Sequence, residues 1–349
     1  MLFVNPLLCS ALSSHGNAWF EPLNALCLSF SPTSKILGCF MTKEWISIFI
    51  YLCSKSAILI YYYFYQMNMI NSYAKINLFL KIGKKLGSGY HNIQSVMQQI
   101  DLSDTISIEP MNEDKIIIEC TNNELENENN LAYKAAALLK KKYKVRQGAR
   151  IYIEKNVPLQ AGLGGGSSNA AYTLKNLNKS WGIKLKEKNL MDLAAEIGSD
   201  VPFFIGESAS LVEGIGEKVK KIRKSFSINV VLINPGFRVS TKWAYSAYDK
   251  YKKKIKTKAD INTLIKAIEK KNIREIANNL HNDFEPIVTK KYKVLNDIRN
   301  NLVRNDALNA GISGSGPTVF GIFNSIYEAR EAFFKVQYDY PFVFLTKTI

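Results

Sequence analysis

The stretch Pro158–Ala171 contains the residues with the clearest chemistry in this sequence. Four glycines fall between positions 162 and 166, and two serines and an asparagine follow them. Glycines let a backbone adopt positive φ and approach a bulky anion closely. A helix that begins there points free N–H groups and its positive dipole end at the anion. The stretch therefore predicts a phosphate cradle made of backbone, with hydroxyls nearby for phosphate or Mg²⁺.

Two common phosphate loops do not match this stretch. A Walker loop requires a lysine directly after its glycines, and none follows here. A dinucleotide-binding loop requires a third glycine, where this sequence has Ser167, and an acidic residue about 20 positions further on. The nearest acidic candidate, Glu187, lies in a lysine-rich polar run. A glycine turn without a ligand is disfavoured, because clustered glycines lose much conformational entropy on folding.

The hydrophobic pattern places the glycine loop between a strand and a helix. Residues 149–155 alternate like a strand, and residues 170–179 are helix formers, so the helix is expected to begin at Ser167. Residues 72–82 alternate as well, with apolar side chains at the even positions. This pattern leaves Lys75 and Asn77 together on the opposite face of that strand.

The remaining pattern mixes strands and helices without a regular alternation, which indicates an α+β fold. Strands are expected at 93–100 (or a short helix there), 105–109, 115–120, 227–234 and 341–346, with a turn at 101–104. Hairpins are expected at 209–222 and, around a second glycine turn, at 307–324. A tight segment at 198–204 is expected to precede the first hairpin. Helices are expected at 131–142, capped by Asn130, and at 188–196, 241–251, 261–270, 273–280, 292–301 and 326–335.

Composition indicates a globular protein rather than a nucleic-acid-binding one. The 349 residues suffice for two domains, and 47% are hydrophobic and 22% charged. The formal net charge of +16 could indicate a nucleic-acid partner. However, the lysines are spread along the chain and no nucleic-acid motif is present. We attribute the charge to compositional bias, with attraction of a polyanionic nucleotide as a secondary effect.

The cysteines indicate a reducing compartment. Of five cysteines, only Cys120 lies beyond residue 53. The main part of the chain therefore carries no disulfide framework and no paired-cysteine metal site. We expect a cytoplasmic protein.

Residues 1–66 differ from the rest and are excluded from the fold. The apolar run from Trp45 to Tyr65 has the length of a membrane span, but Lys55 near its middle disfavours one. The segment is poor in acids like a plastid-type transit peptide, yet it lacks arginine. We favour a third interpretation, in which the natural start is Met67 or Met69 and the upstream residues come from an early start codon.

Three segments in order resemble the motifs of the GHMP kinases, which phosphorylate small-molecule hydroxyls with ATP. These are Lys75–Asn77 with the later Tyr90 and His91, the loop at 158–171, and Gly311–Pro317. The resemblance runs from about residue 70 to the end of the chain. It departs from the motif at Ala161, where the family often has glycine. Further matching segments are Ala74–Leu80, Gly89–His91, Gln99–Asp104, Gly164–Ala170, Ile197–Phe204, His281–Pro286 and Gly314–Pro317.

The resemblance implies a GHMP kinase fold. Residues 67–224 would form a ribosomal-protein-S5-like, ATP-binding domain, and residues 225–349 a ferredoxin-like domain, with the site in the cleft between them. It implies ATP and Mg²⁺ as cofactors and a small-molecule substrate, a cytidine diphosphate sugar alcohol. It further implies a monomer or homodimer without a nucleic-acid or membrane partner.

The resemblance assigns the reacting groups to Asp200 and Lys75. Asp200 would be the catalytic base, which orients a hydroxyl and accepts its proton. Lys75 would keep that carboxylate ionised and stabilise developing charge. Outside this context, Asp200 would be interpreted as a turn-stabilising residue and Lys75 as a solvated strand lysine. Asn77, on the same face as Lys75, would bind substrate.

Substrate and ATP contacts are carried over in the same way. His91, otherwise more typical of a packed or surface histidine, would bond the cytosine edge. Tyr90 would stack on the ring, with Tyr245 (or Trp243 or Phe237) on its other face. Lys155, Asn130 and Asn169 would lie on the adenosine side, and Ser168 is the candidate Mg²⁺ ligand. The remaining ATP contacts would come from Pro158, Gly162, Leu163, Gly164, Gly165, Gly166, Ser167 and Ser168, with a second turn at Gly314, Ser315 and Gly316.

Two alternatives stay open from the sequence. The chain could be a GHMP kinase for another alcohol, such as mevalonate or homoserine. It could also be a membrane-attached nucleotide-binding protein without catalysis, anchored by residues 45–65; intact Asp200 and Lys75 disfavour this.

Overall fold

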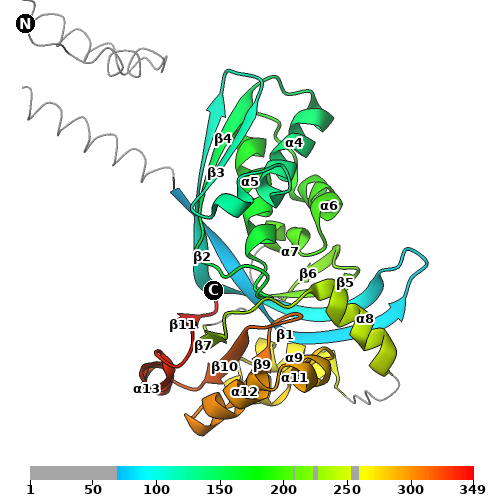
Figure 1. Ribbon diagram of the computed structural model, residues 1–349. Helices are drawn as coiled ribbons and strands as arrows, with labels where there is room; N and C mark the ends of the chain where they lie inside the picture. Colours follow the sequence, from blue (N-terminus) through cyan, green and yellow to red (C-terminus); the bar gives the residue numbers. More distant parts are fainter. Residues whose placement is uncertain (1–68, 207–208, 223–226, 253–258) are drawn as a thin grey trace, which may run out of the picture. The chain divides into compact units, whose positions relative to one another are not determined.

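The computed structural model describes residues 69–349, except 207–208, 223–226 and 253–258 (Figure 1). Residues Met67–Ile349 form one compact unit. The predictions for residues 1–66 lie outside the described residues. Within the described residues, no helix has the length and apolar character needed to cross a membrane.

The larger sheet is built around two long antiparallel strands, β1 and β2. Seven strands form it, in the order β3-β4-β2-β1-β8, with β5 pairing β2 and β6. The predicted turn at 101–104 is wrong. Strand β2 runs through it, because a bulge opposite Tyr73 and Ala74 accommodates the extra residues. The strands are β1 (Met69–Lys85), β2 (His91–Met111), β3 (Ile116–Cys120), β4 (Gly148–Glu154), β5 (Ser210–Gly214), β6 (Lys218–Lys221) and β8 (His281–Asn282).

Strand β1 is buried on both faces. Ala74, Ile76 and Leu78 pack into a hydrophobic core, as the alternation predicted. Lys75 and Asn77 on the other face are also buried, at 3% and 2% exposure. The interpretation of Lys75 as a solvated lysine is therefore wrong, and its charge needs polar partners inside the protein.

Four helices lie along one side of the larger sheet (Figure 1). They pack on it through Leu139, Leu174 and Phe203, which share a core with Ile106 and Ile151. The helices are α4 (Leu131–Tyr143), α5 (Gly165–Ser180), α6 (Glu187–Ile197) and α7 (Val201–Gly206), and a short 3₁₀ helix, η1 (Asn123–Leu125), precedes α4.

Helices α5 and α7 differ from expectation at their starts. Helix α5 begins at Gly165, two residues before Ser167, where the sequence pattern had placed it. The segment at 198–204 turns helical from Val201, because Pro202 is tolerated in the first turn of a helix. Asp200 therefore directly precedes helix α7.

The smaller sheet has four antiparallel strands in the order β11-β7-β10-β9. In chain order this is 4-1-3-2, the arrangement expected for a ferredoxin-like domain. Val231 and Ile233 of β7 face one core, and Val230 and Leu232 face another that includes Ala74 of β1. The two sheets therefore share a core. The strands are β7 (Asn229–Asn234), β9 (Asn309–Ile312), β10 (Val319–Phe323) and β11 (Phe342–Lys347).

The helices of this half follow the predicted pattern with one addition. Helix α11 was missed because Pro286 interrupts the sequence pattern, although a proline is compatible with the first turn. The α+β prediction is confirmed. The helices are α8 (Thr241–Tyr251), α9 (Ile261–Glu269), α10 (Ile273–Asn278), α11 (Glu285–Lys291), α12 (Val294–Arg304) and α13 (Ile326–Val336).

Candidate active site

The glycine loop ends in a helix start without side-chain caps. Gly164 is the N-cap of α5, with φ of +71°, and makes no side-chain hydrogen bond. Ser168 N donates to Gly164 O, which leaves the N–H groups of residues 165–167 without an acceptor inside the helix. A Cβ on Gly164 would lie 2.8 Å from Phe204 Cζ and 3.1 Å from Lys75 Cγ. Only glycine fits there, and the three N–H groups form a site for an anion.

A second glycine turn docks on the first, backbone against backbone. Ser313 Oγ donates to Gly162 O at 2.8 Å, and Thr318 N donates to Ala161 O at 3.3 Å. A Cβ on Gly162 would lie only 2.0 Å from Ser313 O. The predicted turn at Gly314, Ser315 and Gly316 thus lies against the predicted cradle, and Gly314 and Gly316 adopt positive φ.

Lys75 and Asp200 form an ion pair beside the loop. Lys75 Nζ lies 3.6 Å from Asp200 Oδ2, with the two side chains 4% and 31% exposed. Nζ also donates to Asn77 Oδ1 at 2.5 Å, and Lys75 N donates to Leu163 O of the loop at 2.9 Å. Burial lowers the pKa of Lys75, and the charge of Asp200 opposes that shift. The pair combines a held cation with a carboxylate that a ligand can reach.

The two serines at the start of α5 have different surroundings. Ser168 is fully buried, and its hydroxyl donates to Tyr73 O and accepts from Ser72 Oγ, both at 2.7 Å. Ser167 is only partly buried. These contacts do not support Ser168 as a metal ligand, because its hydroxyl already has two protein partners.

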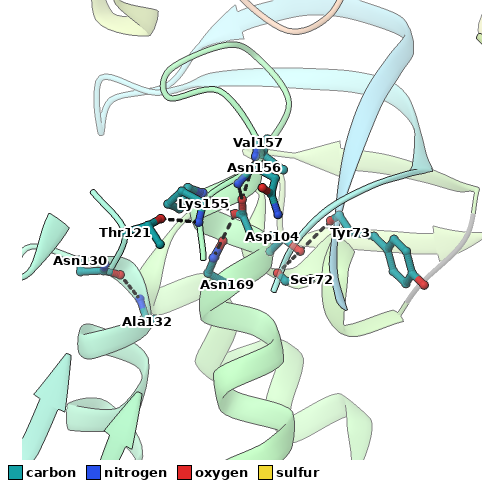
Figure 2. A network of polar contacts seen from close by, with 11 residues as sticks. Ser72, Tyr73, Asp104, Thr121, Asn130, Ala132, Lys155, Asn156, Val157 and Asn169 are labelled. Carbon is teal, nitrogen blue, oxygen red and sulfur yellow. Dashed lines mark hydrogen bonds and ion pairs between the residues drawn. The ribbon is translucent and has the colours of Figure 1, made fainter. Parts of the chain in front are cut away.

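The residues expected on the adenosine side surround a buried carboxylate, Asp104 (Figure 2). Lys155 forms an ion pair with Asp104, and Asn169 Nδ2 donates to it at 3.1 Å. Asn130 lies at the start of α4, where its Oδ1 accepts from Ala132 N at 2.9 Å as the predicted N-cap. Its Nδ2 donates to Leu125 O at 3.0 Å, so both ends of the Asn130 amide already have protein partners.

The residues expected around a cytosine are only partly brought together. His91 stacks on Tyr245, with ring centroids 5.1 Å apart and 16° between planes. Burial and then the charge of Asp200 raise the pKa of Tyr245 to about 12. Tyr90 stands apart with 60% of its surface exposed. Of the three aromatic candidates only Tyr245 contacts His91, since Phe237 and Trp243 pack against Tyr292.

Asp249 is a site residue that sequence reasoning missed. Its Oδ1 lies 2.9 Å from His91 Nε2, and its Oδ2 accepts from Lys85 Nζ at 2.8 Å. Hydrogen bonds from Lys85 and His91 lower the pKa of Asp249 to about 2. The available signal was its helical spacing, because Asp249 follows Tyr245 by four positions on a predicted helix.

The family models match two parts of the chain. Residues 130–207 match GHMP kinases N terminal domain, and residues 264–341 match GHMP kinases C terminal. A 4-diphosphocytidyl-2-C-methyl-D-erythritol kinase of Caldicellulosiruptor bescii is 43% identical over 280 residues, which cover 80% of this chain and 97% of the relative. The protein of the same name from Clostridium botulinum (strain Eklund 17B / Type B) is 42% identical, with 80% and 99% coverage. This chain belongs to the GHMP kinase family.

Solved structures agree with this assignment. The crystal structure of a 4-(cytidine 5'-diphospho)-2C-methyl-D-erythritol kinase is 26% identical, with a TM-score of 0.69, and covers 80% of this chain and 98% of that one. A mevalonate kinase from L. major, solved with R-mevalonate, has a TM-score of 0.63 at 14% identity, over 80% and 95% of the two chains, which shows the fold alone.

The predicted family, its fold and its kinase activity are confirmed, and as a GHMP kinase the protein uses ATP. The domain boundary between residues 224 and 225 stays a prediction.

Proposed function

We propose that this GHMP kinase transfers a phosphoryl group from ATP to the 2-hydroxyl of 4-diphosphocytidyl-2-C-methyl-D-erythritol, on the non-mevalonate route to isoprenoid precursors. The match to the relatives that bear this name covers 97% and 99% of their length. The observation that carries the proposal is the stacking of His91 on Tyr245, an aromatic pair suited to a nucleobase, with His91 held by Asp249 at 2.9 Å. A kinase for mevalonate or homoserine would have no use for such a pair.

Asp200 is the proposed base. Its partly exposed carboxylate orients the 2-hydroxyl and accepts its proton as the oxygen attacks phosphorus. Lys75, held at 3.6 Å from Asp200 and by Asn77, keeps the carboxylate ionised and offsets charge that develops on the transferred group. Asn77 accepts a hydrogen bond from Lys75, and we assign it to orienting the substrate.

The cradle fits a nucleotide triphosphate. Free N–H groups at residues 165–167 and the absence of side chains at the glycines leave room for phosphates. ATP supplies the phosphoryl group, and Mg²⁺ offsets the phosphate charge. Of the two serines we assign Ser167 to the metal-bound phosphates, because Ser168 is committed to Ser72 and Tyr73.

The His91 pocket, formed by His91, Tyr245, Tyr248 and Asp249, recognises the cytosine. Because ionised Asp249 can only accept hydrogen bonds, His91 Nε2–H donates to it, and Nδ1 faces away as an acceptor. In this tautomer Nδ1 of His91 suits the exocyclic amine of cytosine. Tyr90, next to His91 in the chain and 60% exposed, would turn onto the base and stack on it. We further propose a cytoplasmic protein that is a monomer or homodimer.

Substrate-dependent ADP release by the full chain tests the proposal. We expect turnover with 4-diphosphocytidyl-2-C-methyl-D-erythritol and none above background with mevalonate or homoserine. Cytidine 5'-diphosphate should compete with the substrate. Equal turnover with another alcohol, or indifference to cytidine nucleotides, would contradict the assigned substrate while leaving the family intact.

A further inference from the structure

Asp104 is a fully buried carboxylate that no catalytic step uses. It lies on β2, opposite Ser72 of β1, with no exposed surface. Its Oδ1 accepts from Asn156 N and Val157 N, both at 2.8 Å. Its Oδ2 accepts from Lys155 and from Asn169 Nδ2 (Figure 2). One carboxylate thus joins the segment after β4 to the second turn of α5.

These contacts fix the direction of the Asn169 amide. An ionised carboxylate only accepts hydrogen bonds, so Asn169 must point its NH₂ group at Asp104. Its Oδ1 then faces the other way. That oxygen is buried and has no hydrogen-bond partner among the described residues, although Asn169 is only 2% exposed. A buried acceptor without a partner is unfavourable, which indicates that a ligand donor completes it.

The same carboxylate holds the ammonium of Lys155 at the phosphate cradle. The Lys155 side chain is 8% exposed, and its Nζ lies 3.2 Å from the position that a Cβ of Gly165 would occupy. Gly165 is the first residue of α5. A buried cation there requires a counter-charge when no ligand is bound, and Asp104 provides it.

We propose that Asp104 is a positioning residue for the nucleotide, which aims Asn169 Oδ1 as an acceptor at a donor on the ATP nucleoside and holds Lys155 beside the start of α5. The proposal rests on ATP as the phosphoryl donor. Two donors share this chemistry, the 6-amino group of adenine and a ribose hydroxyl. Asp104 itself touches neither.

Reversing the hydrogen bond between Asp104 and Asn169 tests this role. In Asp104→Asn the amide oxygen keeps the two backbone N–H groups, and the new NH₂ group faces both Asn169 and the ammonium of Lys155, which loses its counter-charge. Asn169 must then rotate and present a donor to the nucleoside. We expect KM for ATP to rise about tenfold, with kcat changed less than about threefold. Asn169→Asp should weaken ATP binding similarly, because the new carboxylate at residue 169 would face the carboxylate of Asp104.

The double variant Asp104→Asn/Asn169→Asp restores the hydrogen bond between an amide and a carboxylate, with the negative charge moved from residue 104 to residue 169. The new carboxylate accepts from the NH₂ group of residue 104 and can pair with Lys155, while its second oxygen faces the nucleoside as an acceptor. We expect KM for ATP to return to within about threefold of the parent value, a non-additive rescue. A merely structural role for Asp104 predicts no such recovery.

Two nucleotide analogues identify the donor. Inosine triphosphate lacks the 6-amino group, and 2'-deoxy-ATP lacks one ribose hydroxyl. The parent protein should discriminate against one of them, and Asp104→Asn should discriminate less. A parent protein that accepts both analogues, and also 3'-deoxy-ATP, as well as ATP would overturn the assignment of the Asn169 acceptor to either group.

Asp283→Asn is the matched control. Asp283 is 2% exposed, and its carboxylate accepts from Ile82 N at 2.7 Å and lies 2.8 Å from His281 Nε2, so like Asp104 it contacts a backbone donor and a side chain. Asp283→Asn should lower the melting temperature without raising KM for ATP. Calorimetric binding of a non-hydrolysable ATP analogue measures the same affinities without substrate, so an incorrect acceptor alcohol would not obscure the result. Unchanged affinity in folded Asp104→Asn would overturn the proposal.

Discussion

The two glycine turns are joined by main-chain contacts, whereas the His91 pocket is joined by side chains alone. In the first region Lys75 N donates to Leu163 O at 2.9 Å, and Thr318 N donates to Ala161 O at 3.3 Å. In the second, His91 stacks on Tyr245 and bonds Asp249 at 2.9 Å. A backbone contact cannot be altered without moving the chain, while a side chain can be replaced singly. We therefore expect substitutions in the first region to affect folding or chemistry, and those in the second to affect substrate affinity.

Asp200→Asn gives the largest expected effect on rate. The amide cannot accept the proton, so kcat should fall by a factor of about 10³, within the usual contribution of a positioned base. KM for either substrate should change little, and stability should fall because buried Lys75 loses its counter-charge and keeps only Asn77 as a partner. Steady-state kinetics and thermal melting measure both. The exposed Asp192→Asn on α6 is the control and should behave like the parent protein.

If Asp200→Asn retained the parent kcat, a residue other than Asp200 would have to be the catalytic base. Tyr245 would not replace it, since its pKa of about 12 keeps the phenol protonated.

Gly164→Ala tests the main-chain region directly. The residue has φ of +71°, and the added Cβ would lie 2.8 Å from Phe204 Cζ. We expect a stability loss of about 1–3 kcal/mol and at least a tenfold rise in KM for ATP, because the start of α5 shifts.

Gly182→Ala separates strain from crowding. Gly182 has φ of +66°, but a methyl group added there would have nothing within 4 Å among the described residues. It should lose stability, about 1 kcal/mol, without any change in KM for ATP. If both variants bound ATP normally, the tight fit of the cradle would not matter for the nucleotide.

The main-chain region was also the more predictable one. Gly162 and Gly164 must be glycine for local steric reasons, so their spacing alone predicted a cradle. Alternation predicted that Lys75 and Asn77 share a face of β1, and both lie there. The start of α5 was misplaced by two residues, because nothing in the sequence marks where a loop of glycines becomes helical.

The side-chain networks could be predicted less well. Asp104 lay inside an expected turn, and its burial depends on a β-bulge that pairs distant residues. Asp249 meets His91 across 158 positions of sequence, which no local pattern specifies. Tertiary pairing decided both, so sequence reasoning identified the motif residues and missed the residues that hold them.

Tyr90→Ala tests the His91 pocket from its exposed side. The ring is 60% exposed and contributes little to folding, so the unfolding free energy should change by less than about 0.5 kcal/mol. Loss of its stacking on cytosine should raise KM for the cytidine substrate about tenfold, with KM for ATP unchanged. Tyr90→Phe, which keeps the ring, should retain the parent affinity. An unchanged KM in Tyr90→Ala would mean that His91 and Tyr245 bind the cytosine ring without Tyr90.

Asp249→Asn has the smallest expected effect and shows a distinctive pH dependence. The variant loses the acceptor that orients His91, so KM for the cytidine substrate should rise about threefold, typical of one weakened hydrogen bond. The pKa of Asp249 falls on folding from an ordinary 3.8 to about 2, so the folded protein binds this proton more weakly than the unfolded chain. Its stabilising contribution is therefore complete above about pH 4 and is lost as the pH falls towards about 2. Urea unfolding of parent and variant at pH 6, 4 and 3 should show a stability difference that narrows only below pH 4. A difference independent of pH would mean that Asp249 acts through packing rather than through its charge.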